Sequence, residues 1–246
     1  MNADQLLLID LSSLAHPLFH MSASEPDQNW TSTHIVARVR ALSTQHPHAA
    51  ICCDTGKSFR NDLAPRVALG DGKYSGYKAD RPERDARLYH QIDLAIEQLR
   101  KDGYPIWKAD NFEADDVIAT ATTQALAIDG ASVLIATADK DLLQLVSPRV
   151  TVKNTGPNAD GSVRGVEEVV AKFGVTPTQM LDYLSLVGDT ADNIVGAKGI
   201  GGVTATKLLK AHGSLDAIYA AMDKGMVNGM TPGIRSSLVE FRDRRD

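Results

Sequence analysis

Three short apolar segments of the chain each end at an aspartate. They are "DQLLLID", "HAAICCD" and "ASVLIATAD", which end at Asp10, Asp54 and Asp139. Runs of this length that are apolar throughout are typical of strands buried on both faces of a parallel sheet. Segments with a helical spacing of apolar residues lie between them, at 31–45, 82–102 and 113–128. We therefore expect an α/β fold with a mostly parallel, mixed sheet flanked by helices.

The alternation of strands and helices ends near residue 155. We place an α/β core at 1–155, in which "YPIWKA" and "RVTVKN" are further strands, and a helical region at 156–246. The short helical patterns of this second region lie at 166–173, 177–187, 203–211, 214–222 and 233–241. Within the core, 63–81 has three glycines and little periodicity, so we expect it to be a mobile segment.

Acidic side chains gather where the strands of the expected sheet end. Since ligands bind at the carboxyl ends of parallel strands, we expect these acids at one edge of the sheet. The motif "FEADD" opens the helix at 113–128 and adds acids to its first turn. In an extended loop, Asp139 and Asp141 would point the same way. The acids expected at this edge are Asp10, Asp54, Glu113, Asp115, Asp116, Asp139 and Asp141.

Each acid alone has an ordinary explanation, because acids suit the first turn of a helix and aspartate is a common turn residue. Together, however, neighbouring buried carboxylates would raise one another's pKa, and unpaired burial costs free energy. A hard divalent cation removes this cost, and an all-oxygen donor set selects Mg²⁺ or Mn²⁺ rather than zinc. The sequence has no His and Cys cluster with zinc spacing. We therefore predict a Mg²⁺ site, at which Mn²⁺ can substitute.

A second acidic pair, Asp189 and Asp192, closes a helical pattern in "LVGDTADNIVGAKGIGGVTATKLL". The bland interpretation is a polar helix terminus. Yet glycines follow, and then a helix from about Val203, which is the pattern of a helix–hairpin–helix element at about 178–212. Glycines allow close approach of the backbone, and the N–H groups of a helix start can bind a phosphate. The pattern indicates a phosphodiester held beside metal ions.

The composition limits the possible partners and the location of the protein only weakly. The formal net charge is −5, but setting aside the nine acids named above leaves 22 of the 31 acids against 26 Lys and Arg, so a nucleic-acid partner is not excluded. No apolar run is long enough to span a bilayer, and residues 1–10 lack the pattern of a secretion signal. Adjacent Cys52 and Cys53 are expected to be reduced, which indicates a cytoplasmic protein, and the short apolar runs indicate one without a membrane partner.

The segments "FEADDVIAT", "ATADKDLLQLV" and "LVGDTADNIVGAKGIGGVTATKLL", in this order, resemble the 5′-nuclease domain of bacterial DNA polymerase I and the related flap endonucleases. The resemblance is clearest from Lys101 to Tyr219 and traceable from Leu6 to Arg100. No polymerase region follows, so the chain resembles a free-standing member. The resemblance implies a PIN-like 5′-nuclease fold, with an arch-like segment at 60–90 over the active site and a helix–hairpin–helix element that binds duplex DNA.

The resemblance also implies roles for individual residues. Five of the nine acids correspond to ligands of a tighter metal site, which are Asp10, Asp54, Glu113, Asp115 and Asp116. The other four correspond to a second site, namely Asp139, Asp141, Asp189 and Asp192. Arg60 matches a phosphate contact, and Tyr77, Lys78 and Arg81 match the base of the arch. There Lys78 and Arg81 would stabilise charge on the phosphate, and Tyr77 would stack on a base.

In the hairpin, the resemblance implies DNA contacts and a K⁺ ion held by backbone carbonyls at Gly196, Gly199 and Gly201. Val203 stands where the family usually has a lysine, and we expect Lys207, one turn later, to substitute for it as a DNA contact. A further departure is His16–Pro17, where the family has an aromatic–arginine pair. The segment between Arg60 and Tyr77 is also longer than usual, which leaves open whether 61–76 forms a threadable arch.

The expected function is a monomeric, structure-specific 5′ nuclease of replication and repair, a 5′-3′ exonuclease or flap endonuclease. Two Mg²⁺ ions about 4 Å apart would flank the phosphodiester that is cut. The DNA partner would be a 5′ flap or a nicked or branched duplex, because contacts to the backbone read structure and not base sequence.

Other functions remain open. One is a metal-dependent ribonuclease built on a similar acidic sheet, which a comparison of RNA with flapped DNA would separate. Another is a non-catalytic, structure-specific DNA-binding protein whose acids only bind an ion; it would bind a flap without cutting it. A nucleotide-binding α/β domain ranks lower, because the chain has neither GxxxxGK[ST] nor a strand-linked GxGxxG.

Overall fold

The computed structural model describes residues 5–22, 28–56, 58–60, 78, 85–156, 162–226 and 229–242. The chain divides into two compact units. The first comprises Met1–Phe59 and Glu83–Val166, and the second Arg60–Pro82 and Glu167–Asp246. The domain boundary near residue 155 stays a prediction.

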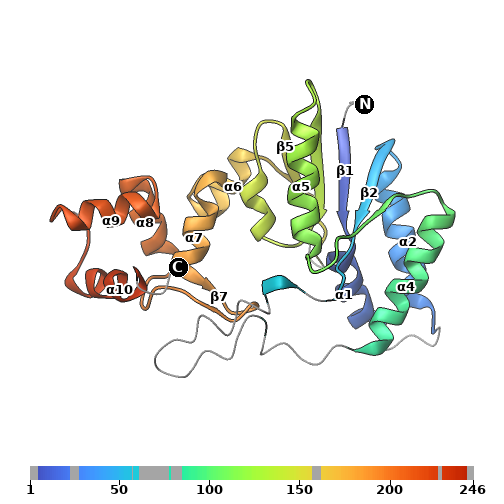
Figure 1. The fold of residues 1–246 in the computed structure, drawn as a ribbon, viewed down its shortest axis with the longest axis horizontal. Helices are drawn as coiled ribbons and strands as arrows, with labels where there is room; N and C mark the ends of the chain where they lie inside the picture. The colour runs from blue at the N-terminus through green and yellow to red at the C-terminus, as the bar shows by residue number, and fades with distance from the viewer. Residues whose placement is uncertain are drawn as a thin grey trace. The chain divides into compact units, whose positions relative to one another are not determined.

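A six-stranded sheet forms the centre of the first unit (Figure 1). Its strands are β1 (Gln5–Asp10), β2 (His48–Cys52), β3 (Ile106–Trp107), β4 (Ser132–Thr137), β5 (Val150–Asn154) and β6 (Val163–Arg164). The strand order is β3-β2-β1-β4-β5-β6, and the neighbouring strands are parallel except for the pair of β5 and β6. The expected mostly parallel, mixed sheet is therefore confirmed.

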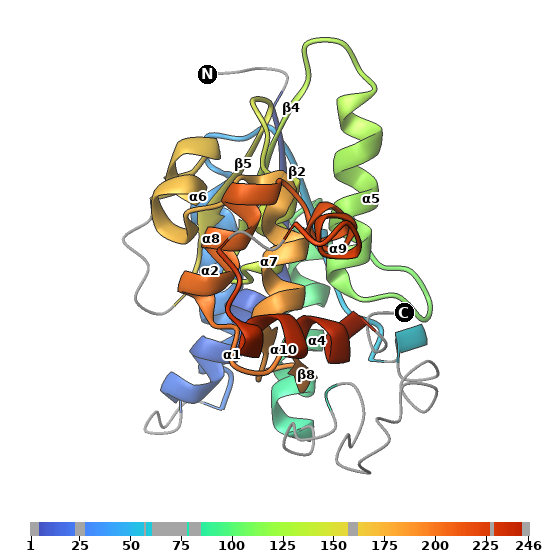
Figure 2. The same ribbon diagram turned by 90° about the vertical axis from the view of Figure 1, so that its left-hand side faces the viewer.

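Helices cover the sheet of the first unit, and they are α1 (Leu11–Met21), α2 (Trp30–Ser43), α4 (Ala86–Lys101) and α5 (Ala114–Leu126). Helices α1, α2 and α4 pack together, and their apolar side chains share one core with Leu7 and Ile9 of β1. Helix α5 packs on β1, β2 and β4 through the fully buried Ile118, and it stands on one side of the strands (Figure 2). Burial between helices explains why the strands are apolar throughout.

Helix α1 was not expected from the apolar periodicity. It follows β1 without a connecting loop, and the side chain of Asp10 caps its N-terminus. Pro17 lies inside the helix, where it removes one backbone donor. A proline in mid-helix weakens any prediction from sequence, but Leu11, Leu14 and Leu18 are buried in the core and hold the helix in place.

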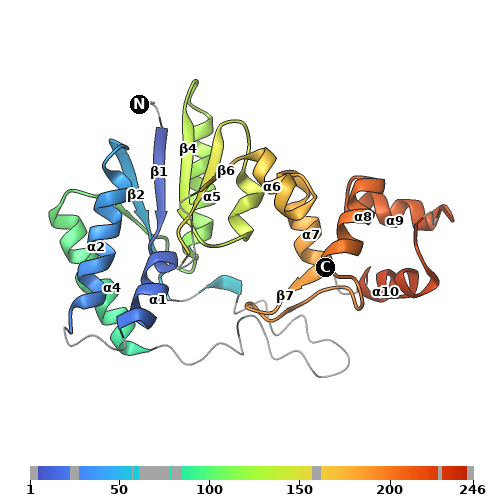
Figure 3. The same ribbon diagram turned by 180° about the vertical axis from the view of Figure 1, so that it is seen from behind.

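The second unit is mainly helical (Figure 3). Its helices are α6 (Val166–Phe173), η4 (Pro177–Gln179), α7 (Met180–Val187), α8 (Gly202–His212), α9 (Leu215–Asp223) and α10 (Pro232–Arg242). The first residue of α6, Val166, still belongs to the first unit. A short antiparallel hairpin of β7 (Gly188–Asp189) and β8 (Ile194–Val195) connects α7 to α8. The helical C-terminal region and its helix–hairpin–helix element are thus confirmed. Within the described ranges, none of the helices has the length and apolarity that crossing a bilayer requires.

Candidate active site

Asp10, at the end of β1, is the most buried of the nine predicted ligands, with 5% of its surface exposed. Its carboxylate accepts hydrogen bonds from the backbone N–H of Ser13 at 3.1 Å and from the hydroxyl of Thr137 at 2.8 Å. Burial raises the pKa of Asp10 to about 6 although both hydrogen bonds lower it. The charges of Asp54 and Asp139 raise this pKa further, so carboxylates that follow β2 and β4 act on Asp10.

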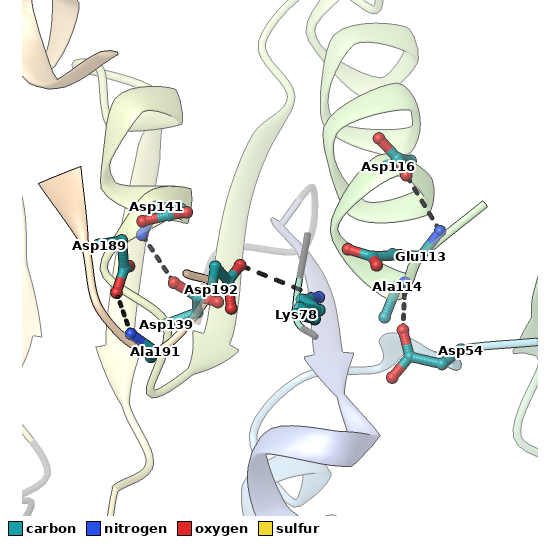
Figure 4. Close-up of polar contacts among 10 residues, drawn as sticks. All are labelled: Asp54, Lys78, Glu113, Ala114, Asp116, Asp139, Asp141, Asp189, Ala191 and Asp192. Atoms are coloured by element: carbon teal, nitrogen blue, oxygen red, sulfur yellow. Dashed lines mark hydrogen bonds and ion pairs between the residues drawn. The ribbon is translucent and has the colours of Figure 1, made fainter. Parts of the chain in front are cut away.

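Asp54 connects the end of β2 to the start of α5 (Figure 4). Its carboxylate accepts hydrogen bonds from the backbone N–H of Ala114, at 2.8 Å, and from the hydroxyl of Ser12. Glu113 is the N-cap of α5, and the carboxylate of Asp116 accepts the backbone N–H of Glu113 at 3.0 Å. The acids of "FEADD" therefore do cap a helix, as the ordinary explanation requires, and they do so beside Asp54.

Asp115 lies in the first turn of α5 and is half-buried. Asp115 lies close enough to the end of β2 for its charge to raise the pKa of Cys52. Burial raises the pKa of the Cys52 thiol, and the charges of Cys53, Asp10 and Asp115 raise it further. Both cysteines are buried and carry no disulfide.

The loop after β4 is not extended, and this corrects the expectation for Asp139 and Asp141. The carboxylate of Asp139 accepts the backbone N–H of Asp141 at 2.8 Å, and Asp141 begins a short 3₁₀ helix, η3 (Asp141–Leu145). The backbone N–H of Asp139 donates to the hydroxyl of Thr137 at 3.0 Å. The two acids thus lie on a turn, because an aspartate readily bonds the backbone two residues on.

Hydroxyl side chains that sequence reasoning missed hold this edge of the sheet together. Ser12 donates to Asp54, and Thr137 donates to Asp10. The hydroxyl of Ser13 accepts the backbone N–H of Ala138 and lies 3.2 Å from the hydroxyl of Thr155. The signal available in the sequence was a serine pair directly after one strand-end aspartate and a threonine just before another.

The donor set of this edge fits a hard divalent cation. In the part of the chain that the structure describes, no three His, Cys, Asp or Glu side chains lie close enough to hold an ion. The predicted acidic ligands at the strand ends nevertheless offer only oxygen, and Asp10 is a buried carboxylate whose charged form burial disfavours. A cation next to Asp10 would favour that charged form. The two-metal centre itself stays a prediction.

Asp189 and Asp192 lie in the second unit, on the hairpin that follows α7. Asp189 is the last residue of β7, and its carboxylate accepts the backbone N–H of Ala191 at 2.9 Å. Asp192, in the turn between β7 and β8, accepts the backbone N–H of Lys78 at its carbonyl, at 3.1 Å. The Lys78 ammonium lies 4.0 Å from the Asp192 carboxylate (Figure 4). A predicted catalytic cation is therefore paired with a predicted metal ligand.

The three predicted hairpin glycines differ in what their backbone requires. At Gly196 an added Cβ would lie 2.4 Å from the carbonyl carbon of Val187 and 2.5 Å from the nitrogen of Gly188, so the backbones touch there. Gly199 has a positive φ of 74°, which favours glycine. Gly201 is the N-cap of α8 and has open space around it. Gly188, with a φ of 80°, was missed by sequence reasoning.

The remaining predicted DNA contacts are placed only in part. Arg60 is half-buried, and Lys207 is exposed on α8. Tyr77 and Arg81 lie outside the described residues.

Models of known protein families match almost the whole chain. Residues 5–174 match the model described as "5'-3' exonuclease, N-terminal resolvase-like domain", and residues 175–245 match "5'-3' exonuclease, C-terminal SAM fold".

Bacterial proteins of similar sequence include DNA polymerases I and a 5'-3' exonuclease. The chain is 40% identical to DNA polymerase I of Rhizobium leguminosarum over 183 residues, which cover 74% of this chain and 17% of the polymerase. It is 39% identical to DNA polymerase I of Treponema pallidum over 249 residues, which cover 97% of this chain and 24% of that polymerase. A 5'-3' exonuclease of Aquifex aeolicus is 41% identical over 161 residues, which cover 65% of this chain and 54% of that exonuclease. The chain thus spans a quarter or less of these polymerases and about half of the exonuclease.

Solved structures share the fold. T5 5'-exonuclease with bound divalent metal ions (zinc) superposes with a TM-score of 0.74 at 22% identity, over 98% of this chain and 87% of that chain. The catalytic core of Rad2 in complex with DNA substrate superposes with a TM-score of 0.58 at 18% identity, over 98% and 72%.

Proposed function

The chain belongs to the 5′-3′ exonuclease family, and on that ground we propose that it is a structure-specific 5′ nuclease. Its substrate is DNA with a 5′ flap, a nick or a branch, and its reaction is metal-dependent hydrolysis of a phosphodiester. T5 5'-exonuclease with divalent metal ions and Rad2 with DNA substrate, which share the fold, support this choice.

A buried carboxylate at the ligand-binding edge of the sheet carries the proposal. Asp10 is held there by Ser13 and Thr137, and its pKa is raised by burial and by Asp54 and Asp139. A protein that only needed a helix cap would be more stable with a neutral residue at this position, since burying a charge is costly. The charge is useful where it meets a cation.

We propose Mg²⁺ as the ion, with Mn²⁺ as a substitute. Asp10 and Asp54, together with the acids that open α5, would hold one ion, and Asp139 with the other predicted ligands would hold a second. When bound, Mg²⁺ lowers the pKa of a water and stabilises the charge that develops on the phosphate. The chain's own part is to fix these oxygens, which Ser12, Ser13 and Thr137 do through their hydrogen bonds.

Lys78 supplies positive charge on the second unit. Its ammonium lies 4.0 Å from the carboxylate of Asp192, which is a predicted metal ligand. We propose that Lys78, with Arg81, stabilises charge on the cleaved phosphate. Exchange of Lys78 for Ala should then slow cleavage more than it weakens binding of DNA.

We propose further that the protein works as a monomer, because one chain carries all nine predicted ligands. A K⁺ ion at the carbonyls of the Gly196–Gly201 loop is part of the proposal, and the tight glycine backbone there supports it. A cytoplasmic location is also proposed, and the two buried thiols, which form no disulfide, are consistent with a reducing compartment.

The test is cleavage of a 5′-labelled flap duplex by the purified protein, with Mg²⁺ and with EDTA. We expect Mg²⁺-dependent cleavage near the flap junction, and the ladder of labelled products separates stepwise removal of nucleotides from a single internal cut. The matched control is the Asp139→Asn variant, which keeps the size of the side chain and should bind the flap without cutting it.

Binding of the flap by the wild-type protein without cleavage would support the non-catalytic DNA-binding protein instead. Preferential cleavage of an RNA substrate of the same structure would support the ribonuclease.

A further inference from the structure

Two loops that border the candidate site are joined by hydrogen bonds. One follows β2 and contains Asp54, and the other precedes α5 and ends at Glu113. The hydroxyl of Thr55 donates to the carbonyl of Phe112 at 3.3 Å, and the backbone N–H of Phe59 donates to the carbonyl of Asn111 at 2.9 Å. The bond from Ala114 to Asp54 is a third link between the same loops. The loops therefore form one fixed surface at the carboxyl edge of the sheet.

Two phenylalanine rings meet on this surface. Phe59 and Phe112 lie with ring centroids 5.4 Å apart and planes tilted by 55°, an arrangement that aromatic pairs favour. Phe59 is 36% exposed and Phe112 44% exposed. Phe112 directly precedes Glu113, so the rings stand next to predicted metal ligands. Rings left this exposed, yet fixed by backbone hydrogen bonds, are suited to an external ligand.

The chemistry around the rings selects the ligand. The carboxylates of Asp54 and Glu113 disfavour a phosphate at the rings themselves, whereas a nucleobase is uncharged and presents a flat π face. Two rings are too small a surface for a stable protein partner, which needs about 800 Å² on each side. Stacking of bases on aromatic side chains is a common way of holding unpaired nucleotides.

We propose that Phe59 and Phe112 form a stacking platform for a nucleobase next to the cleaved phosphodiester. The proposal rests on the proposed function, since the carboxylates beside the rings would hold that phosphodiester. The rings would fix the orientation of the substrate strand in the site without reading its sequence, because every base has a π face. Phe59 and Phe112 are thus positioning residues.

The platform is tested by a double-mutant cycle that combines protein variants with abasic DNA and measures the binding affinity. Flap duplexes with one abasic nucleotide, moved through the positions on either side of the cleavage point, are titrated in EDTA by fluorescence anisotropy. For wild-type protein we expect about a 10-fold loss of affinity at one abasic position. The double variant Phe59→Leu/Phe112→Leu should bind the intact duplex about 10-fold more weakly and lose nothing more at that abasic position.

Two further variants keep the test decisive. Phe112→Trp preserves stacking and should retain the abasic effect, and it guards against a general disturbance at the start of α5. Trp107→Leu changes an equally exposed ring, at 37%, outside the pair, and should leave the abasic effect unchanged.

If the double variant still distinguishes the abasic duplex as the wild-type protein does, or if no abasic position matters to either protein, the platform is ruled out. These measurements need no cleavage. A wild-type protein that binds the flap in EDTA but never cuts it with Mg²⁺ would instead overturn the nuclease activity.

Discussion

Asp10 is a buried carboxylate, and its negative charge should destabilise the folded protein when no metal is bound. Asp10→Asn removes the charge but keeps an acceptor for the N–H of Ser13. From the rise of the pKa from 3.8 to about 6, we expect Asp10→Asn to raise the free energy of unfolding at pH 7.5 by about 1–3 kcal/mol. Urea denaturation in EDTA measures this, and cleavage with Mg²⁺ should be lost.

The sign of the pH dependence follows from the same pKa. The folded protein holds the Asp10 proton more tightly than the unfolded chain, so the contribution of Asp10 falls as pH rises from about 4 to about 6 and is constant above. The stability difference between Asp10→Asn and wild type should therefore be near zero at pH 4 and full at pH 7.5. A difference that is the same at both pH values would contradict this explanation.

Asp116 has two candidate roles that different variants separate. Asp116→Asn keeps an acceptor for the N–H of Glu113 and removes the charge, whereas Asp116→Ala removes both. Both variants should lose cleavage by about 100-fold or more if Asp116 serves the metal. Only Asp116→Ala should also lose stability, by about 1 kcal/mol, in thermal or urea unfolding. Wild-type cleavage by Asp116→Asn would leave Asp116 as a helix cap alone.

In the hairpin between α7 and α8, the backbone at Gly196 packs directly against the backbone of Val187 and Gly188. Gly196→Ala would push a Cβ against Val187 and Gly188, and we expect a loss of about 1–3 kcal/mol in the free energy of unfolding. Gly201→Ala is the matched control, since its Cβ meets nothing and its φ is −92°. Equal stability of the two variants, measured by urea denaturation, would contradict this close packing.

The same pair of variants separates folding from DNA contact. If the backbone at Gly201 approaches a phosphate as the family resemblance implies, Gly201→Ala should weaken binding of duplex DNA although the fold is unchanged. Anisotropy with a flap duplex in EDTA measures the affinity.

Among elements, prediction succeeded for most segments that are long enough to show a period, and the exception is α1, whose pattern Pro17 interrupts. The strands that end at Asp10 and Thr137 and helices α5 and α8 have such patterns. The strands β7 and β8 have two residues each, and no periodicity can reveal a strand of that length.

For the whole molecule, the net charge of −5 would by itself argue against the proposed DNA partner. If the nine acids serve metal ions, the other charges are positive on balance and can meet a DNA backbone. Affinity for a flap duplex in EDTA should then fall by about 100-fold between 50 and 200 mM KCl, as expected for about four phosphate contacts. Affinity that does not change with salt would contradict an electrostatic contact with the backbone.

The sequence by itself determined the parallel sheet and the place of Asp10, Asp54 and Asp139 at strand ends, because periodicity and turn chemistry are local properties of the chain. The tertiary structure alone decided which partners these acids have. Thr137 bonds Asp10 from 127 residues away, and no local pattern encodes such a pairing. Burial also belongs to the folded state, since the pKa of Asp10 rises only when neighbouring elements exclude water from it.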